Sequence, residues 1–174
     1  MLLFLFQTFI HLPVGSTIEK VEVSINGIAP SLFAENDNVY MTFASGDSIQ
    51  YCLLNDKGKK FSAPMFVAVL PKLGVGGGRG PQIIAVKGRL MIAAVNDNSN
   101  TYTFTKNEQA INREKMGRIN DVPDIAKEGF VSLAANNRGE IYAVRLDLRT
   151  DKRNKIVVAM SRNGGRTWLK NKIV

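Results

Sequence analysis

The feature that most constrains the fold is a repeat: three segments of the chain align with one another at a spacing of about 50 residues. Each segment begins with a short apolar stretch, passes through a tight polar turn, and returns in a second stretch rich in β-branched or aromatic residues. The three units start near Ala29, Gly80 and Gly129. Because this pattern is typical of a β-hairpin, each unit is predicted to open with one.

Further strands are expected after each hairpin. A third strand is predicted at residues 48–54, 101–105 and 155–160, and a fourth at 65–69, where Pro64 favours an extended segment. Residues 107–117 have few apolar side chains and no amphipathic face, so we expect a long loop there. Four short strands per repeat are typical of a β-propeller blade. The sequence therefore predicts an all-β, partial β-propeller over residues 17–174, with about three four-stranded blades and an N-terminal partial blade, since residues 17–23 alternate like an outer strand.

The clearest turn motif lies after the third strand of the third unit, at residues 161–168, Ser-Arg-Asn-Gly-Gly-Arg-Thr-Trp. It resembles the Asp-box, Ser-x-Asp-x-Gly-x-Thr-Trp, of the sialidase-like propellers with BNR repeats. A short polar side chain at the third place can bond N–H groups across the turn, glycine permits a positive φ angle, and tryptophan can plug the hairpin. The box residues expected to pin this turn are Ser161, Asn163 in the place of Asp, Gly165, Thr167 and Trp168.

The first two units carry weaker versions of the motif at the equivalent place. In the first unit, Asp56, Gly58 and Phe61 keep the acid, the glycine and the terminal aromatic residue. In the second unit, residues 105–109 stand in register but lack the glycine and the aromatic residue. One good box, one partial box and one eroded box are typical of this family, so the resemblance covers about residues 20–174.

The family resemblance implies a protein that acts on glycans. Asp-boxes lie on outer turns in this family, so the resemblance gives them a structural role. Sialidases of this fold hold the sialate carboxylate with three arginines, and use a Tyr paired with a Glu as nucleophile and an Asp as acid/base. Their Arg-Ile-Pro motif does not occur here, the nearest sequence being Arg79-Gly80-Pro81, so no catalytic residue is assigned. Six blades of this period would take about 300 residues, so we expect this chain alone to be an inactive part of a glycosidase-like ring, completed by further blades of a longer chain.

Candidate ligand-binding residues follow from propeller geometry. The loops that lead into each innermost strand, and the loops that join the second and third strands, open on one face around the central channel. That face gathers the glycine run 74–80 with the loops at 45–47, 96–98, 121–128 and 147–150. Acids and arginines there can recognise sugar hydroxyls and a carboxylate. The candidates are Arg79, Asp97, Asp124, Asp147 and Arg149, and the alternative for each is an exposed loop residue or a local Asp–Arg pair.

The composition narrows the chemistry and the partners. Cys52 is the only cysteine and His11 the only histidine, which argues against zinc chemistry and a Ser-His-Asp triad, and no metal or cofactor is predicted. The formal net charge is +8, with many of the basic residues after Arg145. Since no aromatic residues interleave with these charges as a stacking platform requires, a solvated surface is favoured over a nucleic-acid partner.

The N-terminal residues bear on localisation. Residues 1–16 include the apolar run Leu2–Phe6, which resembles the apolar region of a secretory signal with a cleavage point near Gly15-Ser16. The run lacks a basic n-region, and a buried strand or a truncated start explains it equally well. No other run is long enough to cross a membrane. We therefore expect a secreted or cell-surface protein with a glycan or glycoprotein ligand; the alternative is a non-catalytic propeller that binds protein or glycan.

Overall fold

The computed structural model describes residues 26–54, 60–97, 99–106 and 114–174. Within them, twelve strands form three four-stranded antiparallel sheets, each in chain order. The first sheet, blade 1, contains β1 (Ile28–Glu35), β2 (Asn38–Ser45), β3 (Ser48–Leu54) and β4 (Met65–Val69). Blade 2 contains β5 (Gln82–Val86), β6 (Arg89–Asn96), β7 (Asn100–Lys106) and β8 (Glu114–Arg118), and blade 3 contains β9 (Ala126–Ala135), β10 (Ile141–Asp147), β11 (Lys155–Ser161) and β12 (Lys172–Ile173).

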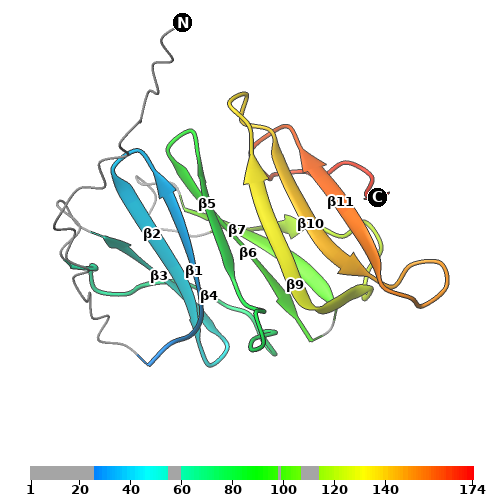
Figure 1. Ribbon diagram of the computed structural model, residues 1–174, viewed down its shortest axis with the longest axis horizontal. Coiled ribbons are helices and arrows are strands. Elements are labelled where there is room, and N and C mark those ends of the chain that lie inside the picture. Colours follow the sequence, from blue (N-terminus) through cyan, green and yellow to red (C-terminus); the bar gives the residue numbers. More distant parts are fainter. Residues whose placement is uncertain (1–25, 55–59, 98, 107–113) are drawn as a thin grey trace, which may run out of the picture.

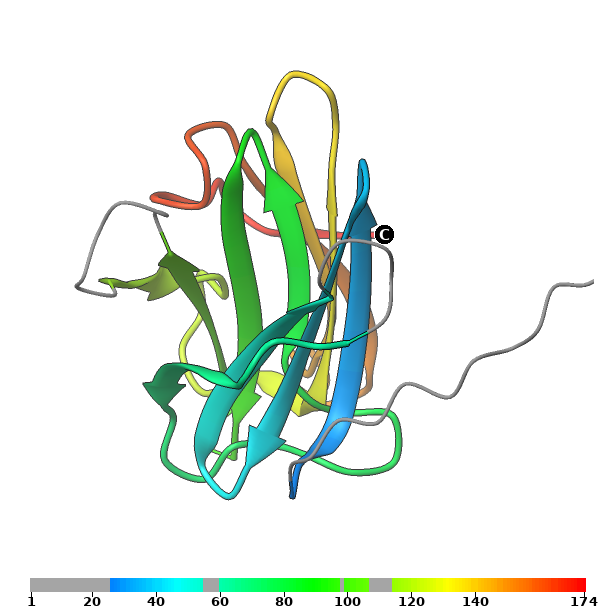
Figure 2. The same cartoon turned by 90° about the vertical axis from the view of Figure 1, so that its left-hand side faces the viewer.

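The three blades stand side by side in an open arc (Figures 1 and 2). The first strands β1, β5 and β9 neighbour one another, so they form the inner edge of the arc. The predicted all-β, partial propeller of three four-stranded blades is thereby confirmed. The predicted N-terminal partial blade at residues 17–23 lies outside the described residues, as do Asp56 and Gly58.

Short turns set the register of the hairpins. β5 and β6 are joined by Lys87 and Gly88, both with positive φ angles of 51° and 73°, and Val86 pairs with Arg89 across the turn. Two positive φ angles are the signature of a turn whose twist matches that of the flanking strands. The register then places alternate residues of each strand on opposite sides of the blade, so one side faces the preceding blade and the other the following blade.

The hydrophobic core lies between the blades. At the first interface, Ala44, Ile49 and Tyr51 of blade 1 pack against a cluster from blade 2 that includes Ile83, Ile92 and Phe104. At the second interface, Ala93 and Val95 of blade 2 pack against Val131, Ala143 and Ala159 of blade 3. Sheet-on-sheet burial of this kind supplies the main apolar stabilisation of the arc.

The fourth strand of blade 2 differs from the expectation. The loop expected at 107–117 is wrong for its last residues, because Glu114–Arg118 form β8 and pair with β7. β8 is a short edge strand with few apolar residues, and such a strand needs only one hydrogen-bonded neighbour, so hydrophobic alternation does not reveal it. The fourth strand of blade 3, expected at the end of the chain after the turn at 161–168, is confirmed as β12, which pairs with β11. No helix within the described ranges could span a membrane.

The turn at residues 161–168 is closed by its own polar side chains. The Thr167 N–H donates to Asn163 Oδ1 at 2.9 Å, and the Gly165 N–H donates to Ser161 Oγ at 2.8 Å. Gly164 and Gly165 have φ angles of 72° and 83°, which favour glycine. The half-buried Trp168 packs against the second interface between blades 2 and 3. The turn therefore ties the outer part of blade 3 to the core; at the equivalent place in blade 1, Phe61 pairs with Leu54 in an isolated bridge.

Candidate ligand-binding face

The loops that join the blades meet at one end of the sheets. The Leu70 N–H donates to the carbonyl of Asp47, and the Asp97 N–H donates to the carbonyl of Lys72. On the other side of blade 2, the Ile125 N–H donates to the carbonyl of Ser99. Backbone bonds thus link the loops leading into β5 and β9 to loops between a second and a third strand, and we call this end of the molecule the loop face.

The glycine run places Arg79 on the loop face. Gly76 and Arg79 exchange two backbone hydrogen bonds of 3.2 and 3.1 Å across Gly77 and Gly78. All three glycines have positive φ angles, so this tight loop requires their freedom. Arg79 Nε donates to the carbonyl of Gly76 at 2.8 Å, which fixes the guanidinium against its own loop. The two terminal nitrogens of Arg79 face no ion-pair partner among the described residues.

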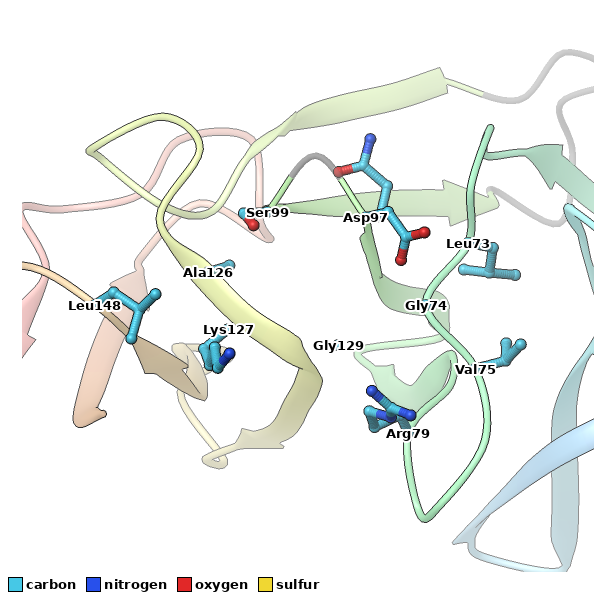
Figure 3. A pocket seen from close by; sticks show the side chains of 11 residues that line it. Leu73, Gly74, Val75, Arg79, Asp97, Ser99, Ala126, Lys127, Gly129 and Leu148 are labelled. Atoms are coloured by element: carbon cyan, nitrogen blue, oxygen red, sulfur yellow. The ribbon is translucent and has the colours of Figure 1, made fainter. Parts of the chain in front are cut away.

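A pocket of about 410 Å³ opens on this face between blades 2 and 3 (Figure 3). Its floor forms where Gly74 and Gly129 meet: a Cβ on Gly74 would lie 3.4 Å from Gly129 Cα and 3.2 Å from the carbonyl oxygen of Val95. Side chains at these two positions would fill the space between the glycine loop and β9. The pocket is therefore built by the close approach of two backbones, an arrangement that leaves room for a small ligand.

Three charged side chains from three segments line the pocket: Arg79 from the glycine run, Asp97 from the β6–β7 loop, and Lys127 from the start of β9. Asp97 is exposed, whereas Arg79 and Lys127 are half-buried. In the part of the chain that the structure describes, the Asp97 carboxylate makes neither an ion pair nor a hydrogen bond. Two cationic groups beside one carboxylate, in a partly enclosed site, suit a ligand that carries both an anionic group and hydroxyls.

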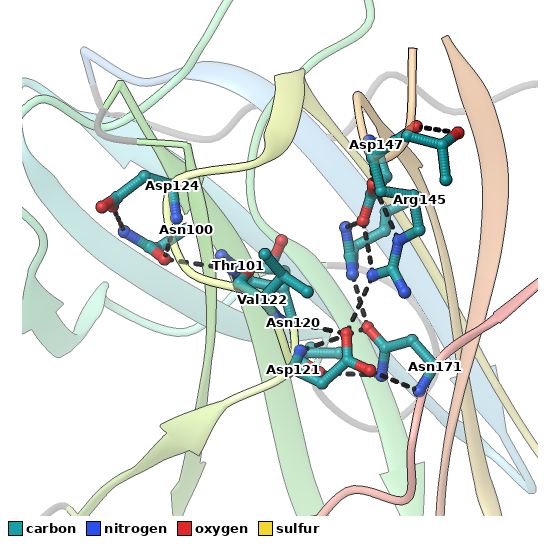
Figure 4. Close-up of polar contacts among 12 residues, drawn as sticks. Asn100, Thr101, Asn120, Asp121, Val122, Asp124, Arg145, Asp147 and Asn171 are labelled. Carbon is teal, nitrogen blue, oxygen red and sulfur yellow. Dashed lines mark hydrogen bonds and ion pairs between the residues drawn. The ribbon is translucent and has the colours of Figure 1, made fainter. Parts of the chain in front are cut away.

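Asp124, another predicted site residue, does not line this pocket. Its carboxylate accepts a hydrogen bond of 2.7 Å from Asn100 Nδ2, and its own N–H donates to Asn100 Oδ1 at 3.1 Å (Figure 4). Asn120 Nδ2 donates to the same Asn100 oxygen at 3.0 Å. Asn100 is buried, so these bonds fasten the loop before β9 to the end of blade 2.

Asp147 and Arg149 belong to an internal charged network (Figure 4). Asp147 is fully buried and forms ion pairs of 2.7 Å with the buried Arg145 and with Arg149. Arg149 also pairs with Asp121 at 2.8 Å, and Arg145 donates to the side-chain oxygen of Asn171. Two arginines and two aspartates balance in charge, which is what burial of such groups demands.

The network changes the acidity of its members. Burial raises the pKa of Asp147, but hydrogen bonds from Arg149 and Arg145 outweigh it, so the net pKa lies below the ordinary value. Burial also raises the pKa of Asp121, but the hydrogen bonds from the Asn171 N–H and from Arg149 outweigh it, so the net pKa lies below the ordinary value. The hydrogen bond to Asp147 raises the pKa of Arg149 further above its ordinary value. Burial lowers the pKa of Arg145, against the opposing effect of its hydrogen bond to Asp147. Because the pKa of a guanidinium normally lies far above neutrality, Arg145 stays protonated, and all four groups are charged at neutral pH.

The structure thus separates the five predicted residues into three groups. Arg79 and Asp97 line the pocket, Asp124 fastens a loop, and Asp147 and Arg149 lie in the internal network, with Leu148 between them reaching the pocket wall. Lys127, which lines the pocket, and the buried Arg145 were not among the predicted site residues. For Arg145 a signal was available, because Arg145 and Asp147 stand two apart on the same side of a strand that is otherwise apolar there. No group of three potential metal ligands occurs within the described ranges.

No protein-family model and no curated protein matches the sequence. Solved structures do match the fold. A polysaccharide lyase, an ulvan lyase bound to -[GlcA(1-4)Rha3S]-, superimposes with a TM-score of 0.59 and 12% identity, over 84% of this chain and 38% of that chain. A sialidase from Streptococcus pneumoniae gives 0.52 and 16%, over 73% of this chain and 19% of that one.

An α-L-arabinofuranosidase from Clostridium thermocellum gives a TM-score of 0.54 and 16% identity, over 84% of this chain and 50% of that chain. This chain therefore spans half or less of the length of each of these three structures. At these identities the likeness establishes the fold, a set of propeller blades, and leaves function to the chemistry of the site.

Proposed function

We propose that this protein is a sialidase-like propeller that acts on glycans and that the pocket between blades 2 and 3 binds an acidic saccharide. The observation that carries the proposal is that Arg79, Lys127 and Asp97 line the same pocket. Guanidinium and ammonium groups can hold a carboxylate or sulfate, and a carboxylate can accept bonds from sugar hydroxyls. The volume of about 410 Å³ is in the range of small-ligand pockets.

Two further points support a glycan ligand. The turn at 161–168 has the polar bonds and the packed tryptophan that the Asp-box resemblance implies, and the structural neighbours named above are, by their titles, a lyase, a sialidase and an arabinofuranosidase. Among the described residues, the pocket offers an arginine, a lysine and one acid, and no tyrosine or second acid lines it. We therefore expect recognition without hydrolysis by this chain.

Binding is tested with a matched pair of ligands. Titration of 3′-sialyllactose into the purified chain, followed by calorimetry or by NMR shifts, is expected to show saturable binding, and lactose at the same concentration is not. The variant Arg79→Met should weaken sialyllactose binding at least tenfold, because the guanidinium fork that meets the anion is lost. Arg89→Met, at the hairpin turn at the opposite end of blade 2, is the matched control and should bind as the unaltered chain does.

The outcomes separate the competing functions. Binding without release of a fluorogenic group from a sialoside supports the proposal for this chain. Turnover by the chain alone would contradict the expected inactivity, and would make the pocket an active site. If a sulfated uronic-acid disaccharide binds and sialyllactose does not, the acidic saccharide that the pocket recognises is a sulfated uronic acid and not a sialic acid. The absence of binding to any acidic saccharide would refute the proposal.

A further inference from the structure

Apolar side chains are exposed on the side of blade 3 that faces away from blade 2. Phe130, Val144 and Ile156 are 37%, 39% and 53% exposed, and with Leu146 they line an apolar hollow of about 360 Å³. The sheet register puts them on one side, because Leu146 pairs with Ile156, and Val144 lies two residues before Leu146. We call this surface the trailing face.

The repeat shows what normally covers such a surface. Val144 lies three residues before the end of β10, and the same position is occupied by Thr42 in β2 and by Ala93 in β6. Thr42 and Ala93 are both 0% exposed. In blades 1 and 2 this side of the sheet is covered by the blade that follows. The trailing face of blade 3 is the same kind of inter-blade surface, and none of the described residues covers it.

Blade 1 carries the complementary surface on its side away from blade 2, which we call the leading face. Leu32 pairs with Met41, and the same place is held by Ile83 paired with Ile92 in blade 2. Ile83 is 3% exposed inside the first interface, whereas Leu32 is 63% exposed. Phe66 and Val69 lie on the same side of blade 1 through their pairing with Gln50 and Ser48, and are 45% and 56% exposed.

We propose that the occupant of both faces is a second copy of this chain, with the trailing face of each copy packed on the leading face of the other. The contact repeats the interface already present twice within the arc, where the following side of one blade meets the preceding side of the next. A single copy cannot join its own faces, because they lie at opposite ends of the arc (Figure 1). Head-to-tail contacts of this kind form a closed ring when the rotations add up. Two copies of three blades give six blades, within the four to eight of known propellers.

The exposed apolar character of both faces supplies the driving force. Contiguous exposed apolar surface of this kind is a mark of protein–protein contact sites. Each copy carries a formal charge of +8, so repulsion between copies opposes assembly at low ionic strength and is screened at physiological salt. The loop faces of the two copies would then surround one channel. This inference does not rest on the proposed glycan binding.

The test is the mass of the 174-residue chain in solution, measured by sedimentation equilibrium in 150 mM salt. We expect a dimer of twice 19.2 kDa. Val144→Asp on the trailing face and Leu32→Asp on the leading face should each give monomers, since a charge cannot be buried in an apolar contact without a partner. Val122→Asp, at an exposed apolar residue of the loop before β9, is the matched control and should remain dimeric.

Mixing the two monomeric variants distinguishes head-to-tail contact from any other geometry. The Val144→Asp copy keeps an intact leading face and the Leu32→Asp copy keeps an intact trailing face, so the mixture should regain a dimer through one good interface. Circular dichroism checks that each variant is folded. A monomeric unaltered chain at 100 µM overturns the proposal, as do open polymers, or a mixture that stays monomeric while the separate variants are folded. Arg79→Met should leave the dimer unchanged, so loss of glycan binding and loss of assembly are separate results.

Discussion

Replacing Asp147 with asparagine should destabilise the fold more than any other single change in the charged network. The substitution keeps the shape of the side chain and removes one negative charge. Arg145 would then hold a positive charge with 0% of its side chain exposed, and the side-chain oxygens within its reach, that of Asn171 and that of the substituted residue, would be neutral. Arg149 suffers less, because it retains its ion pair with Asp121.

The size of the effect follows from burial. Removing one partner of a fully buried ion pair costs about 3–5 kcal/mol, because the remaining charge is left without compensation. With a urea dependence of about 2 kcal/mol/M for a chain of this size, the unfolding midpoint should fall by about 1.5–2.5 M. Burial of both groups at 0% exposure places this pair in that class, and not among surface ion pairs.

Urea unfolding followed by tryptophan fluorescence measures this directly, because Trp168 is the only tryptophan and packs in the interface between blades 2 and 3. Asp151→Asn removes the exposed Asp151–Lys155 pair and should leave the midpoint unchanged. The double variant Arg145→Met/Asp147→Leu removes both charges and should recover most of the lost stability. A midpoint for Asp147→Asn equal to that of Asp151→Asn would refute the reasoning, since it would mean that the Asp147 charge compensates nothing.

Three other outcomes are expected. Gly165→Ala should cost about 2 kcal/mol of unfolding free energy, because the residue has a positive φ and its new Cβ would meet the terminal methyl of the buried Met91. Gly164→Ala has the same kind of φ but open space around it, so it should cost about 1 kcal/mol. Equal losses of stability in urea unfolding would contradict the contact with Met91. Asn163→Ala should cost about 1 kcal/mol by removing bonds across the turn, and Asn163→Asp should keep most of that stability, as thermal melts can compare. Because the pKa of Asp147 is lowered in the folded state, the stabilisation by its carboxylate is fully present above about pH 4 and is lost as pH falls through the folded pKa. The urea midpoint of the unaltered chain should therefore be flat from pH 7 to about 5 and fall below about pH 4. In Asp147→Asn the midpoint should fall less steeply with pH.

Local pattern was enough to predict the blades. The alternation of apolar residues, the two-residue turns and the 50-residue spacing each depend on neighbours along the chain, and the structure has strands at the positions they indicate. The propeller rule also placed the loops of the candidate site together. β8 escaped prediction because an outer edge strand needs only one neighbour and little apolar surface.

The roles of the individual charges could not be derived from the sequence. Arg149 pairs with Asp121, which is 28 residues away, and the Asn171 N–H donates to Asp121 across 50 residues. Nothing in the local pattern distinguishes these groups from Arg79 and Asp97, which are also loop residues with the same chemistry. Which of them face a ligand depends on which segments the fold brings within hydrogen-bond distance, so the pocket and the network are separated only in the folded chain.

By itself, the sequence determined the repeat: its turns and alternation force four short strands per unit and give each blade two apolar sides. The tertiary structure decided which of those sides are covered. Thr42, Ala93 and Val144 hold the same position in three similar strands, yet only Val144 is exposed. The physical reason is that the burial of such a side chain depends on whether another blade packs against it, and the residues of the strand itself do not indicate this.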